Sequence, residues 1–229
     1  MLLTIGIVLL YVRESDFEGE VPDQEKAPSL LENIRLVSTG ADKNGVYLLA
    51  AIFFWFVGWN AMEAFFTIYA RSVLGIEVGT GTQMLTAFAA TLILFAIPSG
   101  LLATRIGRKP TILIGLSGMI VGLVVGFFIR NPTVLLIVLA IMGIFWAFVN
   151  INSLPMVYDL GGEESIGAFT GLYYFSSSAA AITGPILGGW LIDLTNHSWL
   201  WIFSAIFLVL AAFSMTRIRL KTSTQQVQR

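Results

Sequence analysis

The stretch "GLLATRIGRKP", residues Gly100–Pro110, decides the fold because it sets three cations in a short turn between two long apolar runs. The runs cover residues 81–103 and 111–129, and each is close to the roughly 20 apolar residues that a membrane-spanning helix needs. Since the turn is only a few residues long, the two helices must run antiparallel. The sequence therefore predicts a helical membrane protein with this charged turn at one surface of the bilayer.

The composition supports solvation by lipid. Apolar residues make up 56% of the chain and charged residues 12%, against about 25% charge in soluble domains. The net charge of −1 offers no basic surface for nucleic acid. Without any cysteine, and with His197 as the lone histidine, we expect no disulfide, no metal site and no cofactor.

Hydropathy divides the chain into one short apolar run, one polar segment and six spans. The first run rises only about 18 Å as a helix, too short to cross a bilayer. We interpret it as the end of a truncated helix, followed by a linker, an all-α bundle of six transmembrane helices and a tail. The segments are residues 1–12, 13–45, 46–217 and 218–229, and the spans are 46–70, 81–103, 111–129, 133–157, 166–193 and 198–216.

The positions of Lys and Arg predict the orientation, because these residues stay on the cytoplasmic side of short loops. If the linker is cytoplasmic, eleven of the thirteen cations lie inside and only Arg71 and Arg130 lie outside. We therefore expect a multi-pass protein of the cell membrane with a cytoplasmic linker and C-terminus. The charged turn then lies on the cytoplasmic side, and we expect Gly100 and Gly107 to permit a chain reversal and a close helix crossing.

The turn resembles a known cytoplasmic loop. "GLLATRIGRK" is similar to the G-x-L-x-D-R-x-G-R-K loop of the major facilitator superfamily, with Thr104 at the aspartate position. The resemblance implies the C-terminal half of a twelve-helix transporter. It also implies a missing N-terminal half, supplied by another chain or by a second copy, and an inactive gene fragment is the remaining alternative.

Three further segments resemble bacterial sucrose–proton symporters, within or near the glycoside–pentoside–hexuronide cation symporters. They are "AIFFWFVGWNAMEAFFTIYA", "NINSLPMVYDL" and "GAFTGLYYFSSSAAAITGPILGG". The resemblance implies uptake of a sugar or similar small polar solute, coupled to a proton or sodium ion. "GPILGG" instead resembles a motif of drug antiporters, which keeps drug or metabolite efflux as an alternative.

Span 46–70 carries the strongest candidate site. Trp55, Trp59, Asn60, Glu63 and Thr67 recur at helical spacing, and a carboxylate, an amide and indole rings suit a sugar's hydroxyls and C–H face. Glu63 is the only acidic residue well inside a span, so it is our candidate for proton coupling. The alternatives are structural pairing with Arg71 or exposure to water.

Other spans add weaker candidates. We expect Asn150, Ser153, Tyr173 and Ser177 to contact solute. Hydrogen bonding between helices explains Asn150 and Ser153 equally well, and packing and bending are the safer roles for the span with Tyr173 and Ser177. Asp159 lies at the same membrane level as Arg105 and Arg108, and a carboxylate–guanidinium pair there would close a cytoplasmic gate. Simple anchoring of the topology is the equal alternative. The gate motif comprises Gly100, Arg105, Gly107, Arg108, Lys109 and Asp159.

Two spans show no polar pathway. Residues 111–129 and 198–216 have interiors without charge or amide, so we expect them to be outer supports. Gly115, Gly118, Gly122 and Gly126 recur along the first of these, which predicts close packing against a neighbour. No catalytic motif is visible in the chain, and a non-transporting scaffold is the remaining alternative to a transporter.

Overall fold

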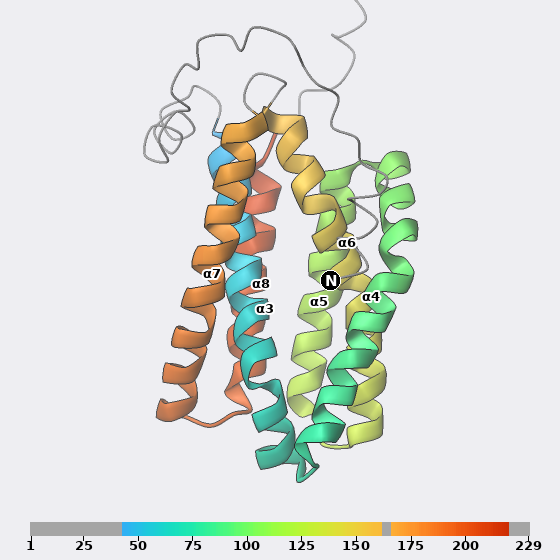
Figure 1. Cartoon of the computed structure of the whole chain (residues 1–229), viewed down its shortest axis with the longest axis vertical. Helices are drawn as coiled ribbons and strands as arrows, with labels where there is room; N and C mark the ends of the chain where they lie inside the picture. The colour runs from blue at the N-terminus through green and yellow to red at the C-terminus, as the bar shows by residue number, and fades with distance from the viewer. Residues whose placement is uncertain (1–42, 162–165, 220–229) are drawn as a thin grey trace, which may run out of the picture.

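The computed structural model describes residues 43–161 and 166–219, and six long helices make up almost all of this part (Figure 1). Each helix is long and apolar enough to cross a membrane, which confirms the six predicted spans. The run 1–12, all but the end of the linker 13–45 and residues 220–229 of the tail lie outside the described residues. The helices are α3 (Asn44–Leu74), α4 (Val78–Ile106), α5 (Arg108–Phe128), α6 (Pro132–Gly161), α7 (Ile166–Leu194) and α8 (Trp199–Arg217).

Two glycines and one asparagine set helix boundaries. Gly75 after α3 has φ +68° and Gly107 between α4 and α5 has φ +94°, a backbone region that favours residues without Cβ. Gly107 therefore confirms the predicted chain reversal at the charged turn. At the start of α6, the Asn131 side chain accepts hydrogen bonds from the backbone N–H groups of Thr133 and Val134 and caps the helix.

The helices form two rows of three that diverge toward one side. One row is α7, α3 and α8, and the other is α4, α6 and α5 (Figure 1). The rows meet closely where α5 packs on α8, and α3 touches α6 over a shorter length, whereas α4 and α7 do not touch. We call the side with α4 and α7 the open side, and the end with the 105–109 turn the motif end.

Glycines let α5 approach its neighbours, as the sequence predicts. A Cβ on Gly118 would lie 2.3 Å from the Phe145 ring, and one on Gly126 would lie 2.2 Å from the Trp201 ring. Gly115 meets the backbone of α6 in the same way. Helices α5 and α8 lie at the end of each row farthest from the open side, and their role as outer supports stays a prediction.

Glycines also join the helices within each row. A Cβ added to Gly184 of α7 would lie 2.6 Å from the carbonyl oxygen of Val57 in α3. A Cβ added to Gly143 of α6 would lie 2.2 Å from the carbonyl oxygen of Phe88 in α4. Gly100 is different, because an added Cβ would meet nothing within 4 Å. The predicted close crossing at Gly100 is therefore wrong.

Candidate functional site

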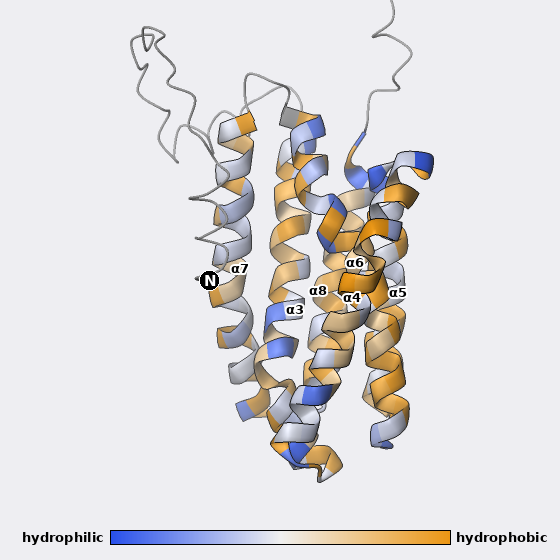
Figure 2. Cartoon of the chain, turned by 45° about the vertical axis from the view of Figure 1, so that its right-hand side comes forward, coloured by the Kyte–Doolittle hydropathy of each residue, from blue (hydrophilic) through white to orange (hydrophobic). Residues whose placement is uncertain are grey.

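The open side exposes parts of four helices. Helices α4 and α7 are the least covered of the six, and α3 and α6 lie between them. Hydrophilic stretches interrupt the apolar ribbon in the middle of α3 and toward the lower end of α4 (Figure 2). Because polar groups are unfavourable against acyl chains, this side is the candidate surface for a second bundle or an aqueous path.

The predicted stripe on α3 runs from the core to the open side. Trp55 is completely buried, and Trp59 is 8% exposed. Asn60 and Thr67 are partly exposed, whereas Glu63 is exposed. Residues eight positions apart on a helix differ by about 80° in direction, so the stripe is wider than a single face.

Trp59 belongs to an aromatic cluster that joins four helices. Its indole stacks on Phe88 of α4, with ring centroids 4.2 Å apart, and on Trp146 of α6, with centroids 5.2 Å apart. Phe56 packs edge-on against both Trp146 and Tyr173 of α7. In this conformation Trp59 has little surface left for a sugar ring, so it contributes mainly to the wall beneath the open side.

Tyr173 and Ser153 connect α7 to α6 within the bundle. Their hydroxyl groups share a hydrogen bond of 3.1 Å, and the Ser153 hydroxyl also donates to the carbonyl oxygen of Asn150 at 2.8 Å. Ser177 donates to the carbonyl oxygen of Tyr174 in its own helix. The bond between Ser153 and Tyr173 joins the two helices, whereas the other two bonds lie within one helix each. The Asn150 side chain is partly exposed.

Glu63 has the most unusual position of the described carboxylates. It lies about 16 Å from the Leu74 end of α3, well within the hydrocarbon depth, whereas Glu77, Asp159 and Asp193 lie at or near helix ends. Among the described residues it has no ion pair, and the expected alternative of pairing with Arg71 is not observed. The neighbouring Asn60 amide donates to the carbonyl oxygen of Phe56 at 2.7 Å, which orients that side chain along α3.

The motif end brings part of the predicted gate together. Arg108 forms an ion pair with Asp159 and donates a hydrogen bond to the carbonyl oxygen of Pro155 at 2.8 Å. Arg108 and Asp159 line a cavity of about 400 Å³. Gly100, Thr104 and Gly107 line the same cavity. The carboxylate and guanidinium therefore tie α6 to the start of α5 beside a polar cavity.

The remaining cations of the turn act separately. Arg105 is exposed, and Asp159 pairs with Arg108 instead of with it. Lys109 donates to the carbonyl oxygens of Thr216 and Ile218, at 3.2 and 2.6 Å. Because the last carbonyls of a helix lack partners within the helix, Lys109 caps the C-terminus of α8.

Several site residues escaped the sequence reasoning. Phe88 is one apolar residue among many in its span, so the sequence does not distinguish it from its neighbours. Its stacking on Trp59 depends on the tertiary fold. Asn152 donates to Ser99 at 2.9 Å, a fully buried bond between α6 and α4 that helical spacing alone did not predict. Gln83 is exposed near the Val78 end of α4, and an amide in an apolar run was the available signal.

The described residues contain no group of three or more His, Cys, Asp or Glu side chains that could hold a metal ion. The polar groups on the open side are instead a carboxylate, amides and hydroxyls. Such groups bind hydroxyls, amines or a small cation through hydrogen bonds and charge.

Comparison with known proteins identifies the family. The chain matches the description "Major Facilitator Superfamily" over residues 74–228, which is more than half of its length. The chain belongs to the major facilitator superfamily. Its six helices accordingly form a half of that fold.

The relatives and the solved structure that the chain matches are longer than the chain. "Multidrug resistance protein MdtH" of Yersinia pestis (strain Pestoides F) and of Yersinia pseudotuberculosis serotype O:1b (strain IP 31758) are each 27% identical over 115 residues, covering 50% of this chain and 29% of theirs. A crystal structure of a mutant of the peptide transporter POT with sulfate matches 83% of this chain and 41% of its own, with a TM-score of 0.69 and 16% identity. The chain therefore spans less than half the length of these proteins.

Proposed function

We propose that the chain forms half of a secondary transporter that moves a small polar solute by alternating access. A second six-helix bundle would face the open side, and solute would bind between the two bundles. Membership of the major facilitator superfamily supports this proposal, as does the asymmetry of the bundle. The other bundle comes from a separate polypeptide segment or from a second copy of this chain.

The exposure of Glu63 is the observation that carries the proposal. A charged residue at the centre of a membrane span is unfavourable by about 2.5–3.5 kcal/mol on insertion scales, so we expect Glu63 to face water or protein instead of acyl chains. Glu63 is exposed and has no ion pair among the described residues, so its carboxylate is accessible to a cation or a solute. We infer that Glu63 binds the coupling proton or sodium ion, or hydrogen-bonds the solute directly.

A sugar or similar hydroxylated solute is the substrate class that the polar groups fit best. Glu63, Asn60 and Thr67 offer a carboxylate, an amide and a hydroxyl on one helix, and Asn150 adds an amide from α6. Because the Trp59 ring is stacked on Phe88, aromatic contact with a sugar would require the stack to separate or would come from the exposed Tyr174. Tyr173 and Ser177 would line the same path from α7.

The test compares two Glu-to-Gln variants in vesicles that hold the chain together with its complementary bundle. We expect Glu63→Gln to abolish accumulation of labelled sugar driven by a proton or sodium gradient, because the neutral amide cannot load and release a cation. Glu77→Gln, the same change in a loop, should accumulate sugar as the unaltered protein does. Equal accumulation by all three proteins would exclude the coupling role of Glu63 and would favour a scaffold or an inactive fragment.

Drug or metabolite efflux is the second candidate function. The similarity to proteins named for multidrug resistance favours it, as does the close packing of Gly184 and Gly188 in "GPILGG" against α3. The same vesicles separate the two candidates by direction and substrate. Efflux predicts gradient-driven export of an apolar dye and no uptake of sugar. Symport predicts gradient-driven uptake of sugar and no export of the dye.

A further inference from the structure

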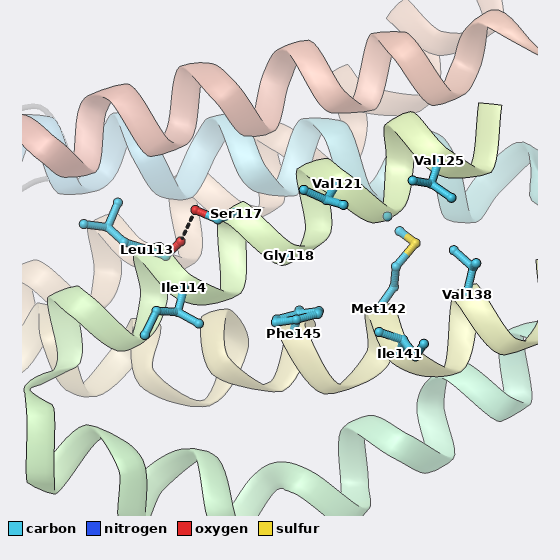
Figure 3. A pocket seen from close by; sticks show the side chains of 11 residues that line it. Leu113, Ile114, Ser117, Gly118, Val121, Val125, Val138, Ile141, Met142 and Phe145 are labelled. Carbon is cyan, nitrogen blue, oxygen red and sulfur yellow. Dashed lines mark hydrogen bonds between the residues drawn. The ribbon is translucent and has the colours of Figure 1, made fainter. Parts of the chain in front are cut away.

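An apolar groove of about 610 Å³ runs between α5 and α6 (Figure 3). It involves none of the helices α3, α4 or α7, so it is separate from the open side. Ser117 is the one hydroxyl-bearing residue in its lining, and its hydroxyl already donates to the carbonyl oxygen of Leu113 at 2.8 Å. The groove therefore offers no unsatisfied hydrogen-bonding side chain to an occupant.

The groove lies wholly at the depth of the bilayer's hydrocarbon. The 21 residues of α5 rise about 31 Å, which matches a hydrocarbon core of about 30 Å. The α5 residues that line the groove extend from Leu113 to Val125. They begin about 8 Å from the motif end of the helix and stop about 5 Å from its other end.

We infer that this groove binds one acyl chain of a membrane phospholipid. Its length along α5 is about 18 Å, slightly more than the roughly 15 Å of one leaflet's hydrocarbon, so a single extended chain fills it. Its rim consists of exposed aliphatic side chains on both helices, including Val121 and Ile141. A methylene chain meets these groups without leaving a polar group desolvated.

The floor of the groove argues against a second helix as the occupant. Close helix approach in membranes needs exposed small residues. Here Gly118 is covered by the Phe145 ring and Gly122 by the Met142 side chain, each within 2.4 Å of an added Cβ. The exposed rim residues are instead branched, and a thin flexible chain fits between them better than a helix does.

The experiment uses phospholipid with a photoactivatable diazirine in its acyl chain, in vesicles containing the full chain with its complementary bundle. After illumination, mass spectrometry locates the labelled residues. A bound acyl chain predicts labelling of Val121 and Ile141 several-fold above that of Val124 and Ile137, which are exposed on the same two helices but lie outside the groove. Even labelling of all four residues would overturn the inference, because bulk lipid contacts every exposed position.

Paired variants test occupancy of the groove itself. Val121→Trp places an indole across the groove and should remove label from Ile141, whereas Val124→Trp makes the same change outside it and should leave that label unchanged. Ile141→Trp, compared with Ile137→Trp, repeats the test from α6 if the first variant fails to fold. If Val121→Trp leaves the label at Ile141, or instead dissociates a dimer of this chain, the acyl-chain assignment is wrong.

Discussion

Individual residues in this bundle have roles that depend on which neighbour they meet. Trp59 and Glu63 lie one helical turn apart on α3, yet the first is buried in an aromatic stack and the second is exposed. The glycines differ in the same way. Gly118 of α5 faces an aromatic ring, whereas Gly100 of α4 faces open space. A methyl group added at each position should therefore have opposite effects.

We expect Gly118→Ala to lower the free energy of unfolding by about 1–3 kcal/mol, because the new Cβ would overlap the Phe145 ring and force the two helices apart. Gly100→Ala is the matched control. It adds the same methyl group within a helix where nothing lies within 4 Å, and should raise stability by up to about 1 kcal/mol through helix propensity. Denaturant unfolding in detergent measures both changes. Equal effects of the two substitutions would contradict the close α5–α6 contact.

At the scale of elements, the helices and the turn between α4 and α5 could be predicted from the sequence, because run length, hydropathy and charge determine them locally. The direction that each side chain faces could not. Trp55 and Glu63 belong to one stripe by their spacing, but Trp55 is buried in the core and Glu63 is exposed. The Phe88 stack and the Ser99–Asn152 bond depend on how α4 meets α3 and α6, which no single helix encodes.

The pairing of α6 with the start of α5 leads to a second element-scale prediction. The Arg108–Asp159 pair is 37% and 52% exposed, so its loss should change stability by less than about 1 kcal/mol. Its effect should instead appear in gating. We expect Asp159→Asn to increase the reaction of a membrane-impermeant thiol reagent, added at the motif end, with a cysteine introduced at Ser177.

Arg105→Gln is the control, since it removes an exposed cation of the same turn that does not pair with Asp159. It should leave the reactivity of the introduced cysteine unchanged. Exchanging the charges in the double variant Arg108→Asp with Asp159→Arg should restore the original reactivity. If Asp159→Asn and Arg105→Gln behave alike, the ion pair has no role in closing the motif end.

At the scale of the whole molecule, the six helices leave one side unfinished. The exposed surface of α7 changes in polarity along the helix. Tyr174 and Ser178 place hydroxyls on its uncovered surface, whereas Ile182, Ile186 and Trp190 give an apolar surface toward its other end. All five side chains are exposed in the bundle alone. We expect a second bundle to give the hydroxyl-bearing residues access to water and a bilayer to cover the apolar ones with lipid.

The absence of cysteine from the chain allows that difference to be measured with single introduced thiols. Ser178→Cys and Ile186→Cys lie about 80° apart around α7, and both replace exposed side chains. With the complementary bundle present in vesicles, we expect a water-soluble maleimide to modify position 178 and a lipid-soluble one to modify position 186. Transported solute should slow the first reaction and leave the second unchanged. If both positions react only with the lipid-soluble reagent, the open side faces hydrocarbon, and the chain does not enclose a path with a second bundle.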